Sequence, residues 1–462
     1  MQNWVRAELG SVDLGDARRE ARLRKLVEQL SQQPEGSFGQ ACPTPADRQA
    51  AYRFFSNEAV EPEQILQAHF ESTWGRMAGQ PLVLVVQDTT GLDYSAHRGT
   101  QGLGPVTSGG QGLLVHSALA LTEEGEPLGL VHQQSWVRDP EQVGKTGLRR
   151  TRLWSEKESY KWQRTVEAVA PHQQAGQRLI IVGDRESDVY GLLASPRPAG
   201  VELLVRSAQN RKLSKQEGRL HDVVGKGAVG GTMLVEVGRA QQRPARTAIC
   251  QLRYRAITLK PPLHADAGVP PVPVSLWVVV IDEPNPPKAE KPLHWVLLAS
   301  WPIQSLAQAV QCARWYSRRW LVERYHFVLK SGCRIEQSQL RERVRLERLE
   351  AVYAIVAWRL LALTYQGRLR PNDSCESVLS GLEWQVLYAH HHHRLPAQGE
   401  ASPTLGEALA WVAKLGGYWG RKADAPPGVK VVWRGLMRLY GMVEGFALAT
   451  DLLSPQAQCD EC

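Results

Sequence analysis

The pattern of apolar and polar positions predicts a helical beginning to the chain. Asp16 can cap a helix whose leucines recur at helical spacing, and Thr44 precedes a second helix with proline in its first turn. Arginines lie on both helices, among them Arg22, Arg48 and Arg53, and aromatic residues stand beside the last two. Clustered arginines suit contacts with nucleic-acid phosphates. A solvated pair of surface helices would show the same pattern, so both interpretations stay open here.

From about residue 80 the pattern changes to short apolar runs typical of buried strands. The predicted elements are strands at 82–86, 112–121 and 127–137, a helix at 154–170, and strands at 179–182 and 201–205. The second and third strands are expected to form a hairpin around Gly125. Three antiparallel strands followed by helix, strand, helix and strand predict an α/β fold with a ribonuclease-H-like core.

Two aspartates follow buried strands of this predicted core. Asp88 closes the strand at 82–86, and Asp184 closes the strand at 179–182. These strands are neighbours in such a sheet, and open α/β sheets place their ligands at strand ends. Either aspartate alone would be an ordinary turn former. Two of them at matching strand ends predict a shared site.

A third carboxylate lies on the predicted helix at 315–330, around which we expect the rest of the chain to be organised. At about 100° per residue, Tyr316, Arg319, Glu323 and Lys330 fall within an arc of roughly 60°. An amphipathic surface helix with solvated charges would also show this row. With the two strand-end aspartates, however, Glu323 completes a set of carboxylates able to hold two Mg²⁺ ions about 4 Å apart.

Further regions flank this core. Residues 207–300 have the pattern of a small antiparallel sheet, inserted before the helix that carries Glu323 and joined by proline-rich loops. The chain after Lys330 is expected to be helical, with a break near Pro371. We therefore expect an N-terminal helical domain at 1–66, a catalytic core at 67–370 and a C-terminal helical domain at 371–462.

Two short runs invite a metal interpretation. The consecutive histidines His390–His393 would point in different directions around a helix and cannot converge on one ion, so we expect them to face solvent or phosphate. The pair Cys459 and Cys462 has no second pair nearby to complete a zinc site, which favours a frayed tail.

Composition narrows the class of protein. The chain has 462 residues, 43% hydrophobic and 22% charged, as in an ordinary globular protein. A net charge of +8 permits a polyanionic partner. The apolar runs are too short to span a membrane, and the first residues, MQNWVRAELG, do not have the pattern of a signal peptide. Seven mostly isolated cysteines favour a cytoplasmic location. Gly144-Lys145-Thr146 lacks the first glycine of a phosphate loop, so no nucleotide cofactor is expected.

Together these motifs resemble a known family. Asp88 within QDTT, Asp184 within GDRESD and the Tyr316, Arg319, Glu323 and Lys330 spacing resemble the DDE transposases of bacterial insertion sequences. More narrowly, the chain is similar to the IS-four family of the Tn-five type, with its Y-R-E-K signature. The segments LGDARREARL, AAYRFF, KSGCRIE and GGYWGRK extend the resemblance over nearly the whole chain.

The resemblance implies a cut-and-paste DNA transposase. Asp88, Asp184 and Glu323 would be the catalytic, metal-binding triad for two Mg²⁺ ions, with Mn²⁺ able to substitute. Water would nick the transposon ends, and the freed 3′-hydroxyl would attack the opposite strand to leave a hairpin. Reopening the hairpin and joining the 3′ ends to target DNA would complete the reaction.

The resemblance also assigns DNA contacts and partners. Tyr316, Arg319 and Lys330 would grip phosphates near the transposon terminus, helped by Arg206. Trp295 is similar to the residue that receives a flipped terminal base, although a core tryptophan on a buried strand is an equal alternative. The C-terminal region would form a homodimer that holds two double-stranded ends in one synaptic complex.

Two rival functions remain at this stage. A catalytically silent DNA-binding protein or inhibitor derived from a transposase would have no need of three converging carboxylates. A ribonuclease-H-like nuclease that cuts without joining would need neither the basic N-terminal helices nor a C-terminal helical domain. Both rivals are therefore less economical explanations than a transposase.

Overall fold

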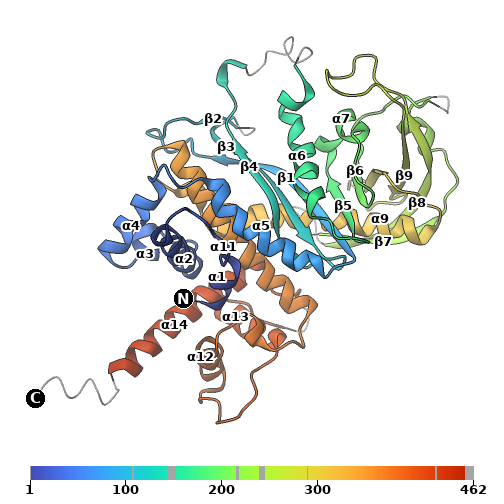
Figure 1. Ribbon diagram of the computed structural model, residues 1–462. Helices are drawn as coiled ribbons and strands as arrows, with labels where there is room; N and C mark the ends of the chain where they lie inside the picture. The colour runs from blue at the N-terminus through green and yellow to red at the C-terminus, as the bar shows by residue number, and fades with distance from the viewer. Residues whose placement is uncertain are drawn as a thin grey trace, which may run out of the picture.

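A single large sheet with helices packed against it organises the molecule (Figure 1). The computed structural model describes residues 2–106, 109–142, 152–214, 218–238, 245–288, 290–421 and 424–452. The strands are β1 (Leu82–Asp93), β2 (Gly104–Pro105), β3 (Gln111–Leu121), β4 (Pro127–Trp136), β5 (Arg178–Gly183), β6 (Val201–Arg206), β7 (Gly231–Val237), β8 (Arg246–Leu259), β9 (Val274–Asp282) and β10 (His294–Ala299). The helices are α1 (Asn3–Glu8), α2 (Ala17–Gln32), α3 (Phe38–Ala41), α4 (Pro45–Phe55), α5 (Pro62–Ala78), α6 (Lys161–Val169), α7 (Tyr190–Ala194), α8 (Leu220–Val224), α9 (Leu306–Arg318), α10 (Trp320–Phe327), α11 (Arg343–Leu369), α12 (Gly381–His392), α13 (Leu405–Leu415) and α14 (Val429–Leu452).

The strand order confirms the predicted ribonuclease-H-like core. β1 pairs antiparallel with β3, and β3 pairs antiparallel with β4. On its other side β1 pairs in parallel with β5, which pairs in parallel with β6. Each core strand is an apolar run buried on both faces, because helices cover the sheet from either side.

The inserted strands continue this sheet instead of forming a separate one, which corrects the sequence-based expectation. β10 pairs antiparallel with β6, and β9, β8 and β7 follow in order to the far edge. The alternation of side chains identified the strands but could not show that one of them pairs with a strand of the core. Pairing with β6 satisfies backbone groups that the edge of the core would otherwise leave open.

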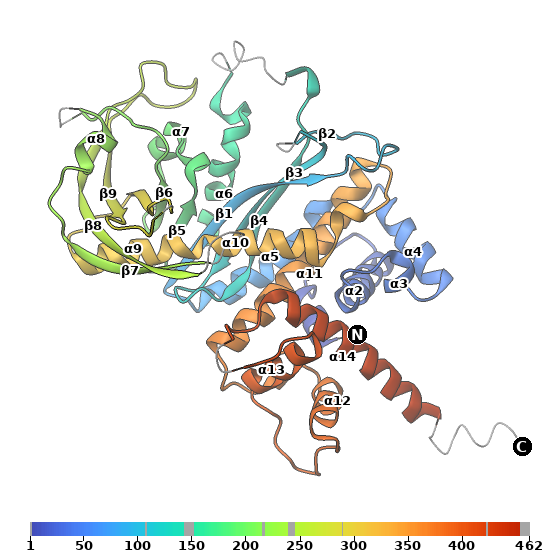
Figure 2. The same ribbon diagram turned by 180° about the vertical axis from the view of Figure 1, so that it is seen from behind.

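Helix α11 lies at the centre of the helical layer. It packs against α5 and β4 on one side and against α2, α13 and α14 on the others. The charged residues near its start give way to a buried stretch from Leu346 to Thr364. Figures 1 and 2 show α12, α13 and α14 as a lobe below the sheet. This lobe packs against α11, and α14 also contacts α2 and the turn at Val328–Gly332. No helix among the described residues is long and apolar enough to cross a membrane.

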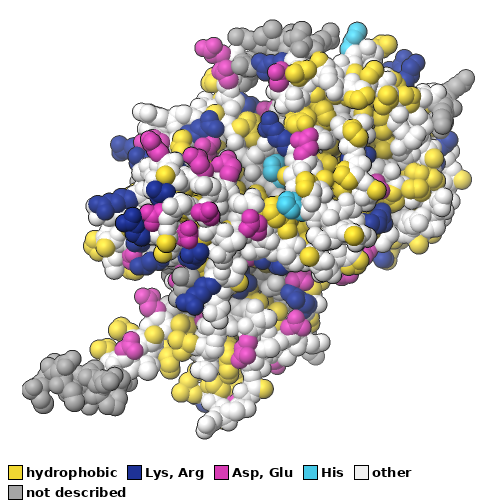
Figure 3. Space-filling view, in the orientation of Figure 1, with side chains coloured by type: hydrophobic (Ala, Val, Ile, Leu, Met, Phe, Trp, Pro, Cys, Tyr) yellow, Lys and Arg dark blue, Asp and Glu magenta, His cyan; other side chains and the backbone are white. Residues whose placement is uncertain are grey.

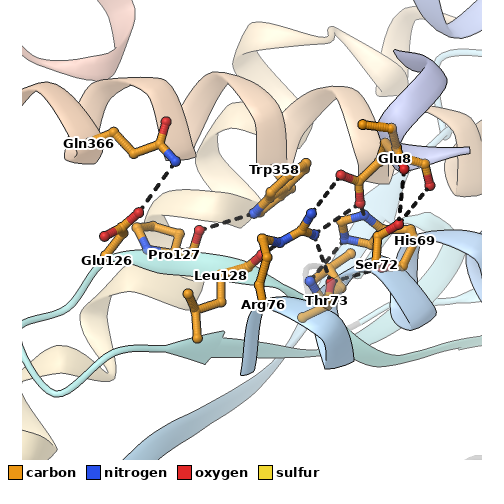
Figure 4. A network of polar contacts seen from close by, with 12 residues as sticks. Glu8, His69, Ser72, Thr73, Arg76, Glu126, Pro127, Leu128, Trp358 and Gln366 are labelled. Atoms are coloured by element: carbon orange, nitrogen blue, oxygen red, sulfur yellow. Dashed lines mark hydrogen bonds and ion pairs between the residues drawn. The ribbon is translucent and has the colours of Figure 1, made fainter. Parts of the chain in front are cut away.

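A buried polar network fastens the first helix to the core (Figure 4). Glu8 on α1 accepts hydrogen bonds from His69 and Arg76 of α5, and Arg76 also donates to the Leu128 carbonyl on β4. The guanidinium of Arg76 lies 4.4 Å from the centre of the Trp358 ring. Burial alone would raise the pKa of Glu8, but His69 and Arg76 outweigh it and hold the pKa at about 2.

The hydrogen bonds of this network fix the state of its histidine. The Leu130 backbone N–H donates to Nε2 of His69, so Nε2 carries no proton, and Nδ1 donates to Glu8. Burial, opposed by Glu8, lowers the pKa of His69, consistent with this neutral form. The N-terminal helices are thus tied to the sheet by an ionised carboxylate with one charged partner and one neutral partner.

A second polar chain lies beneath α10. The Tyr325 hydroxyl donates to Oε1 of Gln133 on β4, and the Gln133 amide donates to Glu350 on α11. Ser117 of β3 joins the same Gln133 oxygen. Burial, with smaller contributions from Glu347 and Glu63, raises the pKa of Glu350 to about 8. The carboxyl group is therefore neutral at pH 7 and holds α10 in place without a buried charge.

We predict that Glu350→Gln makes the free energy of unfolding less dependent on pH. The Glu350 carboxyl ionises near pH 4.5 when unfolded and near pH 8 when folded, so ionisation favours the unfolded chain. Between these values, rising pH should cost the wild type up to about 1.4 kcal/mol per pH unit relative to the variant. Urea unfolding of both proteins at pH 5, 6, 7 and 8 measures the difference. A surface variant, Glu342→Gln, should follow the wild type, and a difference for Glu350→Gln that does not change with pH would contradict the interpretation.

Candidate active site

Asp88 and Asp184 occupy matching positions on neighbouring parallel strands. The register pairs Val86 of β1 with Val182 of β5, so each aspartate lies two residues beyond this last parallel pair. Asp184 directly follows β5, as expected. Asp88, however, does not close its strand, because β1 continues to Asp93 in antiparallel pairing with β3. The Asp88 side chain therefore lies just beyond the point where the parallel pairing of β1 with β5 ends.

Glu323 comes to this point on α10. The expected continuous helix at 315–330 is instead α9, a turn at Arg319, α10 and then a π-helical turn over Val328–Gly332. One row of side chains survives this interruption because Arg319 keeps helical backbone angles. The inner side of α10 is buried as predicted, with Leu321, Val322 and Tyr325 in the core.

Arg319 links two of the three carboxylates. Its guanidinium lies 3.3 Å from Oδ2 of Asp88 and 2.5 Å from Oε1 of Glu323. Burial raises the pKa of Asp88 to about 6, Arg319 opposes the rise, and the nearby charges of Asp184 and Glu323 add to it. The three carboxylates are thus close enough to repel one another, and Arg319 offsets part of that repulsion.

The donor set fits a divalent metal in type, although Arg319 now lies among the donors. All three side chains offer the hard oxygen ligands that Mg²⁺ prefers. Among the described residues, no group of three or more His, Cys, Asp or Glu side chains is arranged as a ready metal cage. In this structure the guanidinium of Arg319 instead contacts one oxygen of Asp88 and one of Glu323. Nearby, the buried Nε of Arg319 and the hydroxyl of Tyr316 have no hydrogen-bond partner in the described part of the chain.

Tyr316 and Trp295 meet beside the carboxylates. The Tyr316 ring is buried and contacts Trp295 edge to face, with ring centres 5.1 Å apart. The sequence placed Tyr316 in one row with Arg319, Glu323 and Lys330, but its ring lies in the core next to β10. Trp295 is half-buried, and it borders a hollow of about 290 Å³. Basic side chains border the same hollow: Arg185, Arg206, Arg246, Lys291 and His294.

Sequence reasoning missed several of these neighbours. Arg185 adjoins Asp184 in the GDRESD run, and His294 adjoins Trp295, so their positions in the chain were available signals. Lys291 lies before the last inserted strand, and no pattern distinguished it. Arg246 forms ion pairs with Glu283 and Glu290, so its charge is already balanced.

A buried acid that the sequence did not single out holds the loop after Arg206. The Arg206 guanidinium donates to the carbonyl of His294 on β10. The loop that follows Arg206 wraps around Asp188, whose side chain is fully buried. Asp188 accepts from the backbone N–H groups of Ala208 and Gln209 and pairs with Arg211 at 2.8 Å.

Lys330 lies near β1, away from the three carboxylates. Its ammonium donates to the Gly91 carbonyl at 2.8 Å and pairs with Glu336 at 3.0 Å. Glu336 also accepts from the backbone N–H of Asp93. Lys330 therefore holds the end of β1 in this structure, and its expected phosphate contact stays a prediction.

The N-terminal arginines differ in their surroundings. Arg22 pairs with Asp47, as does Lys25. Arg48 donates to the Cys42 and Pro43 carbonyls, whereas Arg53 is exposed. Figure 3 shows Lys and Arg side chains mixed with Asp and Glu over these helices, so the surface is basic without being uniformly so.

The structure describes the histidine run but not the other short motifs. His390 and His391 lie in the last turn of α12, and His393 follows with a left-handed backbone. Cys459 and Cys462, like Gly144-Lys145-Thr146, lie outside the described residues.

Comparisons with known proteins agree with this arrangement. Family models match a transposase DNA-binding region at residues 1–60, a transposase DDE domain at 156–359 and a transposase Tn5 dimerisation domain at 355–453. The solved structures include a piggyBac transposase synaptic complex with hairpin DNA, at 9% identity and a TM-score of 0.37. That match covers 98% of this chain and 78% of the other, and its similarity is too low to support an argument. The three family matches, together with the paired aspartates and the Glu323 helix, place this chain in the DDE transposases of the Tn5 type.

Proposed function

We propose that this transposase cuts its element's DNA ends and joins them to a target, with Asp88, Asp184 and Glu323 as its catalytic carboxylates. The observation that carries the proposal is their position: two aspartates in register on β1 and β5, with Glu323 brought to them by α10. Transposases of the DDE family use divalent metal ions. We assign Mg²⁺ here, with Mn²⁺ as a substitute, because the donors are all carboxylate oxygens.

The carboxylates would hold the metal ions, and Arg319 would then turn to DNA. Bound divalent ions supply charge neutralisation at the phosphate and activate the attacking oxygen. When the carboxylates take up metal, the guanidinium of Arg319 loses its present partners and can bind a phosphate instead. The unpaired hydroxyl of Tyr316 is buried, so it would reach a phosphate oxygen only if the structure opened around it. Lys330 and Arg206 would hold neighbouring phosphates.

The reaction would proceed in the order that the family resemblance implies. Water attacks a phosphodiester at the transposon end and releases a 3′-hydroxyl. That hydroxyl attacks the opposite strand and closes a hairpin, which a second water molecule opens. The 3′ ends then attack target DNA. Each water attack breaks a phosphodiester bond into a 5′-phosphate and a 3′-hydroxyl, and each hydroxyl attack forms one phosphodiester bond while it breaks another and releases a 3′-hydroxyl.

The remaining regions would hold the DNA and the partner subunit. Arg22, Arg48 and Arg53 would contact the ends from the N-terminal helices, although Arg22 must first share or leave Asp47. The match to a dimerisation domain supports a homodimer, and α14 exposes Phe446, Leu448 and Leu452 near its end. Two such subunits would bring both ends into one complex. The domain limits at 66 and 370 stay a prediction, and α11 runs up to the second of them.

Glu323→Gln should abolish Mg²⁺-dependent cleavage of a labelled duplex that carries the element's own ends. The amide removes one negative oxygen ligand while keeping the side chain's shape, so end binding in a mobility-shift assay should persist. We expect at least a hundredfold loss of hairpin product, which corresponds to about 2.7 kcal/mol. Glu342→Gln, a surface change, should cleave normally. Tight end binding with no cleavage by the wild type would instead establish a catalytically silent DNA-binding protein.

Trp295→Ala should slow hairpin formation more than the first nick. If Trp295 stacks on a flipped base, its loss forfeits roughly 1–3 kcal/mol of stacking, or about tenfold or more in rate. Trp295→Phe should retain most of the effect. A 2-aminopurine at the terminal position reports flipping by its fluorescence. If Trp295→Ala lowers only the melting temperature and leaves that fluorescence unchanged, Trp295 is a core residue alone.

Asp188→Ala should destabilise the fold and release the loop behind Arg206. The change leaves Arg211 without its charge partner and leaves two backbone N–H groups unpaired, which should cost about 3 kcal/mol in urea unfolding. The double variant with Arg211→Ala should recover part of this loss. Asp222→Asn, an exposed change on α8, serves as the control. If Asp188→Ala unfolds at the same urea concentration as the wild type, Asp188 does not stabilise the loop behind Arg206.

A further inference from the structure

A second cationic hollow lies in the lobe formed by α12, α13 and α14. Its volume is about 770 Å³. It lies between the last turns of α12 and α13 and the middle of α14. Its lining consists of His390, His391, His393, Trp411, Lys414, Leu415, Arg438, Gly441 and Met442. Figures 1 and 2 place these helices away from the sheet beside which Asp88 and Asp184 lie.

The lining is basic, and its charges are not balanced. It contains Lys414, Arg438 and three histidines, but no aspartate or glutamate. Within the described ranges, neither Lys414 nor Arg438 forms an ion pair. Arg394, just beyond α12, shows the contrast, because it pairs with Glu400 at 2.9 Å. Unpaired cations facing one hollow favour an anionic ligand.

The end of α13 beside the hollow does not cancel this preference. The C-terminal end of a helix carries partial negative charge on its free carbonyls. At the end of α13, however, Arg438 donates to the Leu415 carbonyl, and backbone N–H groups of residues 416–418 cover the carbonyls of Val412, Ala413 and Lys414. The carbonyl groups that would repel an anion are therefore already engaged.

The histidines present ring nitrogens at the edge of the hollow. The His391 ring stacks on Trp411, with centres 4.6 Å apart and planes at 22°. This contact holds one ring in place, while His390 and His393 are exposed beside it. A metal is a poor fit, because consecutive residues diverge around a helix and Lys414 and Arg438 would repel a cation.

We propose that this hollow binds the phosphodiester backbone of duplex DNA, at a site separate from the catalytic carboxylates. Lys414 and Arg438 supply fixed charge, and the histidines supply hydrogen-bond donors to phosphate oxygens. Contacts of this kind position a duplex without selecting its sequence. The proposal rests on DNA as the partner but does not depend on catalysis. The histidine run, which has no place in the active site, thereby gains a function.

The test measures how salt weakens binding of the full chain to a mixed-sequence duplex without element ends, in EDTA. Each lost phosphate contact lowers the slope of log K against log salt by about 0.9. Lys414→Gln should lower the slope by about that amount. Adding His391→Gln and His393→Gln should lower the affinity further with little change in slope, because uncharged hydrogen-bond donors release no counterions. Lys430→Gln removes the same charge from α14 outside the hollow and should leave the slope unchanged. All four side chains are exposed, so circular dichroism melting should match the wild type.

Two outcomes would overturn the proposal. If the wild type and the Lys414 and histidine variants show equal slopes, this hollow does not bind DNA. Calorimetric binding of inorganic phosphate below 1 mM, lost in the Lys414→Gln variant while its DNA slope stays wild-type, would assign the hollow to a free phosphate instead. Cleavage of end-bearing DNA with Mg²⁺, measured on the same variants, keeps this result separate from the proposed function. Normal cleavage together with an unchanged slope would reject DNA binding at this hollow and leave the proposed function unaffected.

Discussion

The guanidinium of Arg319 between Asp88 and Glu323 is the interaction on which the site depends. Three carboxylates held near one another in a partly buried place repel, and burial already pushes the pKa of Asp88 up to about 6. One fixed cation reduces that cost and draws α10 against β1. Because burial of Arg319 is outweighed by Tyr316, Glu323 and Asp88, its own pKa rises and it stays charged. The arrangement that suits metal ions is therefore kept folded by a protein cation.

The rest of the fold fixes the positions of Asp88 and Asp184 beside the sheet and of Glu323 on α10. Asp88 and Asp184 are set by the parallel register of β1 and β5, which apolar side chains on both faces enforce. The position of Glu323 is fixed by its helix, because Tyr325 on the same helix is hydrogen-bonded through Gln133 to a neutral Glu350. A charged group at Glu350 would have needed a partner in the core, and protonation removes that need. The site thus combines ionised groups at the surface of the sheet with neutral polar groups beneath it.

Much of this arrangement could be predicted from the sequence, and the exceptions have physical causes. Apolar runs gave β1, β5 and β6 and the aspartates beside them, because burial on both faces leaves an unambiguous pattern. The extension of β1 past Asp88 escaped notice, since its last residues pair only with β3 and are more polar. The buried ring of Tyr316 was also missed. A helical wheel gives direction around one helix, and the neighbour that covers Tyr316 comes from β10, which joins the core by a long-range pairing.

Asp188 and the histidine run illustrate what local pattern cannot supply. Asp188 stands four residues after Asp184, and nothing in the GDRESD run distinguishes a buried acid from an exposed one. Its role follows from a loop twenty residues later that returns to wrap it. The histidines likewise gain meaning only when α13 and α14 bring Lys414 and Arg438 to the same hollow. In both cases the chemistry belongs to groups far apart in the chain. A charge can therefore be assigned to structure or to ligand binding only after its partners are known.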